Sequence, residues 1–324
     1  MLKVLQLVVV TFITIQLSYA QGVSLSAKTY LQSALPSNFE STSDGTPLMT
    51  DYLRSSPYTS ERYLPNADPY SIPTEYTGFI TEFYSHVGNG GLTANTTITS
   101  PDDVFEVFGR DAIVDWVFVE LRASTEANST VATRAALLQR DGDIVALDGQ
   151  SPLNFDEVQP NDYYVVVRHR NHLGIMTSDL VTLSTTATAL DFTDPLTLLW
   201  DQGSTIPGRD YTNMSTDILE ASSGDYRVMW CGDFNADGRV KFNEPKSDLN
   251  MLFLDVIGFE TNVNHDPNFT GAHGYFQSDN DMNGMIKFDS PNDDRIALMN
   301  TVRNYKLNKN KDYNYDHFIE QLLR

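Results

Sequence analysis

The sequence is almost devoid of cysteine, with Cys231 alone among 324 residues. An internal disulfide needs two cysteines, so the stability of this chain must come from core packing or from bound metal. Cys231 stands between Trp230 and Gly232 in an apolar patch, and the wider neighbourhood is acidic. A catalytic thiolate needs a basic, partly exposed setting. We therefore expect Cys231 to be buried and inert rather than reactive.

Basic residues are scarce as well. Lys and Arg number 22 against 43 Asp and Glu, which gives a formal net charge of −21. Such a chain repels nucleic acid and anionic membranes and attracts cations, so we expect no nucleic-acid partner. Solubility in salty surroundings accounts for the acidic surplus equally well. Charge alone therefore leaves a cation-dependent role open without requiring it.

Long apolar runs are missing beyond the N-terminus. Residues 1–20 carry Lys3, then a mostly apolar run at Val4–Leu17, then the small-residue stretch Ser18–Ala20. This order is typical of a secretory signal peptide. A membrane anchor is the alternative, but the run is shorter than the ~20 residues that a spanning helix needs. We predict cleavage after Ala20, a secreted or cell-surface protein, and no membrane span in the mature chain.

The common catalytic motifs are also lacking. The sequence contains no G-x-S-x-G, no H-E-x-x-H and no Gly-rich phosphate loop. The run Arg168–His172 is the strongest catalytic candidate, but nothing local supplies a nucleophile or paired carboxylates. Arg168 and Arg170 would share one face of a strand, where they can pair with Asp115 or Glu120 across a sheet. We expect a structural role and no enzyme, although a site on this domain would lie here.

Residues 21–99 are rich in Ser, Pro and Tyr, with prolines so frequent that long helices are disfavoured. After a strand-like run at Thr29–Ala34, we expect an extended, irregular segment that packs on the following domain. Tyrosines in this segment could stack on sugar rings or pack internally. Their spacing follows no single face, which favours packing. These tyrosines are Tyr58, Tyr63, Tyr70 and Tyr76.

Residues 100–198 predict a β-sandwich domain. Short runs rich in β-branched and aromatic residues alternate with turn signals such as Asp-Gly at regular spacing. The expected strands are 113–122, 131–139, 143–147, 163–170, 179–184 and 187–192. Trp116, Phe118 and Val165–Val167 should lead the core. The predicted fold class is thus mainly β, a sandwich followed by a small α/loop domain.

The C-terminal third changes character. Residues 199–228 read as a connector, 229–303 as a small module, and 304–324 as a linker and a short helix. Two helices are expected in the module, at Asp248–Ile257 and Asp293–Val302. Each begins with an acid, where the helix dipole favours negative charge.

This module contains an internal repeat. DFNADGRVKFNEPKSDLNMLF begins at residue 233, and DNDMNGMIKFDSPNDDRIALM begins 46 residues later. The two copies share the alternating acids and amides, the glycine, a Lys-Phe pair, a proline, and Asp248 or Asp294. Two unrelated polar loops would not share so much, so one structural unit has been duplicated.

The repeated pattern fits calcium. Calcium takes roughly six to eight oxygen ligands, here from positions 1, 3 and 5, the position-7 carbonyl and a closing acid. Glycine at position 6 permits the sharp turn, and Val240 or Ile286 should pack the paired loops. Magnesium resists full dehydration and fits less well. An acidic turn held by Asx hydrogen bonds is the alternative. The expected ligands of the two calcium sites are Asp233, Asn235, Asp237, Arg239 and Asp248, and Asp279, Asp281, Asn283, Met285 and Asp294.

The paired loops resemble dockerin type I repeats, which are duplicated EF-hand-like calcium loops, each followed by a helix. Dockerins carry the last acid at position 12, where this chain has Glu244 in the first loop and Ser290 in the second. The acid shared by both copies follows the proline. We therefore expect Asp248 and Asp294 to close the loops.

The resemblance extends upstream. VDWVFVELR (114–122), VATRAALLQRDGDIV (131–145), YYVVVRHRNHLGIMT (163–177) and MWCGDFNADGRVKF (229–242) are similar to secreted and surface proteins of Bacteroidetes-type bacteria. In those proteins a β domain precedes one pair of dockerin-like loops, and the similarity covers about residues 26–300.

This similarity implies a secreted, calcium-binding, non-catalytic module in cell-surface adhesion or extracellular assembly, with a protein or glycan partner. The alternative is an accessory or hydrolytic component of polysaccharide degradation, because dockerins often accompany glycosidases. A glycosidase would need two carboxylates roughly 5–9.5 Å apart across a cleft.

The choice of closing ligands can be tested by mutation. Asp248→Ala combined with Asp294→Ala should weaken calcium binding more than Glu244→Ala does, since only the former acids recur in both copies. Titration calorimetry on the three proteins measures this. The reverse order would reject Asp248 and Asp294 as ligands.

Overall fold

The computed structural model describes residues 21–36, 38–70, 97–200, 216–221, 224–243, 246–289, 291, 293–305 and 307–315, with side chains of 216–225 excepted. The expected signal peptide, Tyr76, Glu244, Ser290 and the expected C-terminal helix lie outside these residues. The strands are β1 (Val23–Lys28), β2 (Glu40–Ser41), β3 (Pro47–Leu48), β4 (Ile113–Arg122), β5 (Thr130–Gln139), β6 (Asp143–Val145), β7 (Leu153–Phe155), β8 (Asn161–His169), β9 (His172–Met176), β10 (Val181–Leu183), β11 (Thr188–Asp191), β12 (Thr216–Ala221) and β13 (Gly224–Met229). The α-helices are α1 (Pro101–Phe105), α2 (Asp248–Gly258) and α3 (Asp294–Asn304).

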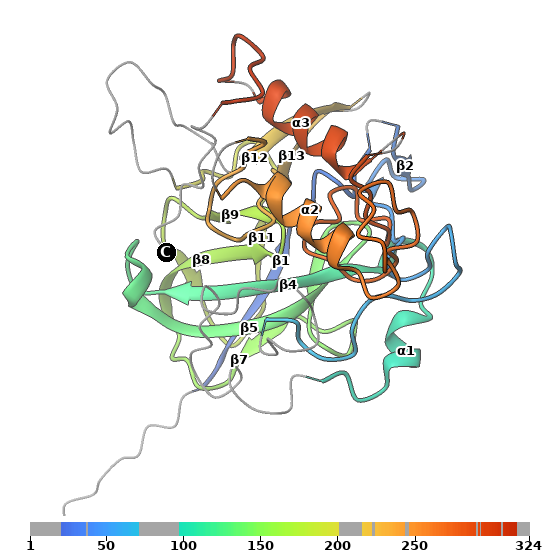
Figure 1. Cartoon of the computed structure of the whole chain (residues 1–324). Coiled ribbons are helices and arrows are strands. Elements are labelled where there is room, and N and C mark those ends of the chain that lie inside the picture. The colour runs from blue at the N-terminus through green and yellow to red at the C-terminus, as the bar shows by residue number, and fades with distance from the viewer. Residues whose placement is uncertain are drawn as a thin grey trace, which may run out of the picture.

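A nine-stranded sheet forms the body of the molecule (Figure 1). Its strands follow the order β10-β8-β4-β5-β6-β1-β11, with β7 also on β1 and β9 also on β8. All of these pairs are antiparallel except β1 and β11, which run parallel. The prediction of a mainly β chain is confirmed. Within the described residues, no helix is long and apolar enough to cross a membrane.

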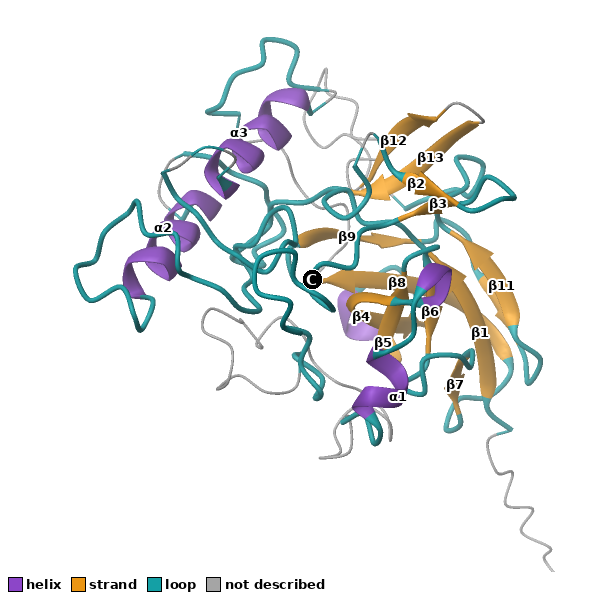
Figure 2. Ribbon diagram, turned by 90° about the vertical axis from the view of Figure 1, so that its right-hand side faces the viewer, coloured by secondary structure: helices purple, strands orange, loops and turns teal. Residues whose placement is uncertain are grey.

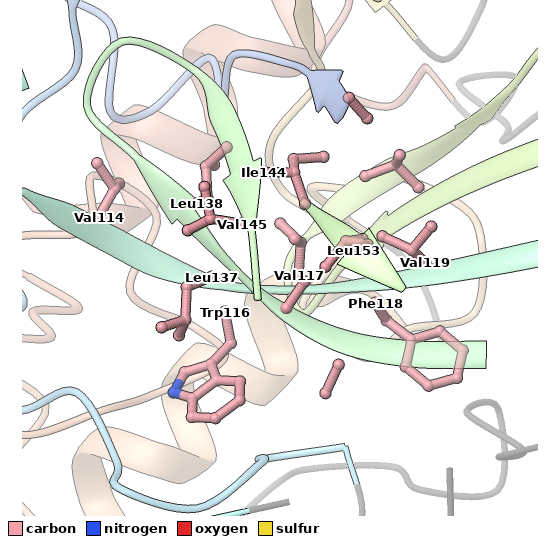
Figure 3. Close-up of a cluster of buried hydrophobic side chains, with 14 of the residues drawn as sticks. Val114, Trp116, Val117, Phe118, Val119, Leu137, Leu138, Ile144, Val145 and Leu153 are labelled. Carbon is pink, nitrogen blue, oxygen red and sulfur yellow. The ribbon is translucent and has the colours of Figure 1, made fainter. Parts of the chain in front are cut away.

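Strand β4 is the centre of the core. All ten of its residues are buried, so both faces of the strand are covered. Trp116 and Phe118 lie on one side of it, and Val117 and Val119 on the other (Figure 3). The β-branched and aromatic run that predicts this strand supplies side chains for two packed faces, which is why Trp116 and Phe118 are at most 1% exposed.

The other expected strands of this region are present as β5, β6, β8, β10 and β11, shifted by a few residues at their ends. The prediction of a strand at Thr29–Ala34 is wrong. The strand is β1, and the chain then turns, with the Leu35 amide donating to the Leu31 carbonyl at 3.0 Å. β1 forms where it does because β6, β7 and β11 satisfy its backbone, an arrangement that local pattern does not reveal.

The segment expected as a connector contains a hairpin. β12 and β13 pair in antiparallel register, from Thr216 with Met229 to Ala221 with Gly224. Met229 also bridges to Leu31 of the N-terminal segment. Cys231 bridges to His172. The chain is thus tied to the main body just before the repeat begins.

The described part of the N-terminal segment, residues 21–36 and 38–70, packs on the sheet. Residues from it belong to the same hydrophobic cluster as β4, among them Leu35, Met49, Leu53 and Leu64. Tyr70 is buried and its hydroxyl donates to the Trp116 carbonyl at 3.0 Å. The tyrosines of this segment therefore differ in burial, because Tyr58 is exposed.

Helices α2 and α3 lie to one side of the large sheet (Figure 2). Asp293 caps α3, with its carboxylate accepting from the Ile296 amide at 2.7 Å. Val240 and Ile286, which follow the loop glycines, are completely buried, as expected. They belong to a second hydrophobic cluster that includes Trp230, Phe234, Leu252, Val256, Leu298 and Val302. This second core joins the two repeats.

A buried ion pair connects the sheet with the turn after β8. Asp115 Oδ2 lies 2.9 Å from Arg170 Nε, and neither side chain is exposed. Burial alone would raise the pKa of Asp115, but Arg170 and hydrogen bonds from His169 and Tyr275 lower it to about 2. The expected pairing of the basic run with acids across the sheet is therefore present. The second pair joins Arg168 Nε to Glu120 Oε1 at 2.5 Å.

Removing one partner of the buried pair should be costly. Asp115→Ala leaves Arg170 buried without its counter-charge, so unfolding should require roughly 3–5 kcal/mol less free energy. Lys28→Ala is the matched control, because Lys28 and Asp143 form a more exposed pair at 3.5 Å and should contribute at most about 1 kcal/mol. Urea unfolding measures both. Equal losses would contradict a central role for Asp115.

Candidate metal-binding loops

Three carboxylates come together in the second loop. One oxygen each of Asp279, Asp281 and Asp294 lies within 4.8 Å of the others. Asp279 and Asp294 are buried, and Asp281 is partly buried. The first two acids come from the loop itself and the third from the first turn of α3. This group is an acidic cluster that could hold a metal ion.

The two loops follow the same backbone course. Position 4 adopts a left-handed conformation in both copies, with φ of 53° at Ala236 and 54° at Met282. Position 6 does so as well, with φ of 78° at both Gly238 and Gly284. Glycine is the residue that tolerates this conformation without strain. In the second loop a Cβ would also meet the Tyr63 ring at 2.5 Å. The duplication seen in the sequence is therefore also a duplication of structure.

The shared acid after the proline reaches back into its loop in both copies. Each carboxylate accepts two backbone N–H bonds of 2.7–2.8 Å, one from position 2 of the loop and one from position 9. The donors are Phe234 and Lys241 for Asp248, and Asn280 and Lys287 for Asp294. Each of these acids thus sits inside its loop, at the start of the following helix.

Acids and amides within the loops also make short-range hydrogen bonds. Asp233 Oδ2 accepts from the Gly238 amide at 3.0 Å, and Asp279 Oδ2 accepts from the Gly284 amide at 2.8 Å. Asn235 Nδ2 donates to the Lys246 carbonyl at 2.9 Å. These are the bonds of an Asx-stabilised turn. They are equally compatible with a metal loop, because a carboxylate oxygen keeps a second lone pair.

Gathering these carboxylates disfavours their ionised forms. Burial, followed by the charge of Asp281, raises the pKa of Asp279 well above its ordinary value. Burial and the same neighbour raise the pKa of Asp294. In the first loop, burial and then Asp233 raise the pKa of Asp248. A bound divalent cation would reverse this repulsion and favour the ionised carboxylates.

The expected ligands at positions 5 and 7 of the loops are not part of the acidic cluster. Arg239 is exposed and Met285 buried, and only their backbone carbonyls were expected to bind. Asp237 Oδ1 accepts from the Arg239 amide at 3.0 Å, and Asn283 Oδ1 accepts from the Met285 amide at 2.9 Å. Both position-5 side chains therefore turn toward their own loop backbone.

The repeat continues beyond its expected end. Asn262 Nδ2 donates to the carbonyls of Val256 at 2.8 Å and Asp266 at 2.9 Å. Asn308, 46 residues later, makes the equivalent bonds to the carbonyls of Val302 and Asp312. The repeated unit therefore reaches residue 312, past the expected boundary at 303. The sequence could have revealed this longer repeat, since both copies carry an Asn followed by an Asp four residues later.

The second loop is also bound to the β8–β9 turn. Asn171 Nδ2 donates to the Asp279 carbonyl at 2.8 Å. Arg170 donates to the Phe276 carbonyl, and Gln277 Nε2 donates back to the Arg170 carbonyl at 2.9 Å. A change in the loop would therefore act directly on the interior of the sheet.

The histidines of the basic run join the same interior network. His169 Nε2 lies 3.0 Å from Asp115, and the Nδ1 atoms of His169 and His172 are 2.9 Å apart. His172 Nε2 lies 3.0 Å from Ser33 Oγ. Burial lowers the pKa of both histidines, which favours neutral imidazoles. This network pairs several buried polar groups with one another.

Cys231 is buried, as predicted. Its sulfur lies 3.1 Å from Gln32 Oε1 and 3.3 Å from Thr301 Oγ1. Burial raises the pKa of the thiol to about 11. The thiolate that would react or bind metal is therefore disfavoured at neutral pH.

No family model matches the chain, and neither a curated protein nor a solved structure is significantly similar to it.

One acid beside the second loop should make stability depend on pH. Asp255 of α2 accepts a hydrogen bond from Ser278, and burial raises its pKa to about 7. A raised folded-state pKa means that stability is greatest below the unfolded pKa of about 4 and is lost as pH rises through 7.

Asp255→Asn should therefore stabilise the protein by roughly 1–3 kcal/mol at pH 8 and have little effect at pH 4. Thermal melting of protein that has been stripped of metal and exchanged into metal-free buffer at each pH tests this, since metal then contributes at neither pH. Glu260→Gln is the control, because Glu260 is exposed just after α2. A stabilisation that is the same at both pH values would show that ionisation of Asp255 is not the cause.

Proposed function

We propose that the chain is a secreted, calcium-binding, non-catalytic module that acts in cell-surface adhesion or extracellular assembly. In this proposal it comprises a β-sandwich domain and a dockerin-like pair of loops. The observation that supports it best is the cluster of Asp279, Asp281 and Asp294 within a loop whose backbone course is duplicated 46 residues earlier. A metal site requires a particular loop geometry, so a duplicated site would keep that geometry in both copies. An acidic surface requires no particular geometry.

Calcium is the metal that these loops suit. Every expected ligand atom is an oxygen, and hard cations prefer oxygen. A loop with several carboxylates, an amide and a carbonyl can supply most of the coordination of calcium, whereas magnesium keeps several waters. We propose one ion in each loop. The closing acids Asp248 and Asp294 would then link each ion to the start of a helix.

The proposed role of the ions is structural. In the second loop an ion would offset the repulsion among Asp279, Asp281 and Asp294, and so hold α3 against the loop. Because Asn171 and Gln277 tie this loop to the β8–β9 turn, the stabilisation would extend to the sheet. Binding energy that is available only in the folded state adds to folding stability.

The alternative is an accessory or hydrolytic component of polysaccharide degradation. One observation favours a saccharide-related role of either kind, namely a cavity beside the second loop with acids and tyrosines in its walls. A hydrolase would require two of the acids to flank a scissile bond. Incubating the protein with an oligosaccharide and finding shorter products would favour the hydrolytic alternative.

Chelation provides the main test. EGTA should lower the melting temperature of the mature chain by several degrees, and excess calcium should restore it. Free calcium at 100 times the dissociation constant would stabilise the folded state by about 2.7 kcal/mol per site. The Asp248→Asn, Asp294→Asn double variant should respond little to EGTA, which controls for non-specific effects. A wild-type melting curve that EGTA leaves unchanged would refute calcium binding.

A further inference from the structure

A cavity of about 610 Å³ lies between the N-terminal segment, Arg140 and the second loop. Asp281 and Asn283 of that loop form part of its wall. Tyr52, Tyr58 and Glu40 contribute from the N-terminal segment. The cavity is within the size range of small-molecule sites, which lies at roughly 300–1,000 Å³. It is built from segments more than two hundred residues apart in the sequence.

Two tyrosines give the cavity exposed aromatic surface. Tyr52 is 40% exposed and Tyr58 is 54% exposed, whereas Tyr70 of the same segment is only 1% exposed. Tyr58 is close to the acidic cluster, since it lines the same cavity as Asp281. A tyrosine ring combines an apolar face with a polar tip, which suits a ligand that has both kinds of surface.

Two of the three carboxylates in the wall are paired with arginines. Arg140, which also lines the cavity, lies 2.9 Å from Glu40 and 3.8 Å from Asp51. Asp51 is also 2.5 Å from Arg54, which is not part of the wall. The acids of the wall outnumber its one base, which disfavours an anionic ligand. Carboxylate oxygens held in place in this way accept hydrogen bonds, so the wall suits a neutral ligand rich in hydroxyl donors.

Asp281 connects the cavity with the metal loop. Its Oδ1 atom is buried and makes no hydrogen bond to any described residue. A buried polar atom normally has a partner, from the protein, water or a ligand. Either a cation in the loop or a ligand hydroxyl in the cavity would provide one.

We propose that this cavity binds a neutral oligosaccharide, with a sugar ring against Tyr52 and Tyr58 and hydroxyl groups toward Glu40, Asp51 and the second loop. The inference rests on the proposed function in one respect, because the bound ion would hold Asp281 and Asn283 in the cavity wall. It gives the proposed glycan partner a specific place on the chain.

The test uses calcium-loaded protein and four neutral probes, namely cellohexaose, xylohexaose, mannohexaose and laminarihexaose, each titrated by calorimetry. At least one should bind. Tyr58→Ala should weaken that binding by about tenfold or more, as loss of an aromatic contact does. Tyr313→Ala is the matched control, because Tyr313 is 48% exposed and packs on Phe242 away from the cavity wall. It should leave binding unchanged.

Two outcomes would overturn the inference. Failure of all four probes to bind would refute a neutral-saccharide site, and an equal loss in both tyrosine variants would place binding elsewhere. Melting curves with and without EGTA, recorded on the same samples, separate this result from the proposed function. Calcium-dependent melting without saccharide binding refutes only the cavity. Saccharide binding that needs Tyr58 in a protein insensitive to EGTA supports the cavity and refutes only the calcium loops.

Discussion

The ion pair between Asp115 and Arg170 fixes how the parts of this molecule are assembled. Asp115 belongs to β4, and Arg170 stands where β8 turns into β9. Tyr275 donates to Asp115 Oδ1 at 2.6 Å, and Arg170 donates to the Phe276 carbonyl. Tyr275 and Phe276 lie just before the second repeat, so the buried pair also binds the start of that repeat to the sheet. The repeat is therefore integrated with the sheet rather than suspended from it.

Elements whose identity is local were predictable from the sequence. β4 begins and ends at the expected residues, because its run of apolar side chains serves two buried faces. α2 and α3 begin within one residue of expectation, because an acid and helical apolar spacing mark their starts. β1, the short strands β2, β3 and β7, β9 and the hairpin β12–β13 were missed. β1 owes its position to strands brought in from distant segments, which sequence periodicity does not encode.

The candidate site likewise has a part that the sequence predicts and a part that it does not. The repeated loops were predictable because a glycine, alternating acids and a repeat distance can all be recognised along the sequence. The cavity was not predictable, since Tyr58 and Arg140 meet Asp281 only after the chain has folded. The tyrosine-rich stretch gave no hint of which ring would be exposed, because that depends on the surfaces packed against it. Tyr70 is covered by contact with Trp116 and Phe118.

The contact between Asp115 and Tyr275 also has a consequence for the order in which the chain can fold. These residues are separated by 160 positions, so β4 is synthesised long before its partner. Contacts of such long sequence separation must overcome loop-closure entropy and form late. Until the segment just before the second repeat is synthesised, the carboxylate of Asp115 lacks the hydrogen bond from Tyr275. A nascent chain cut short before residue 275 would thus carry the strands of its sheet without the segment that completes their interior.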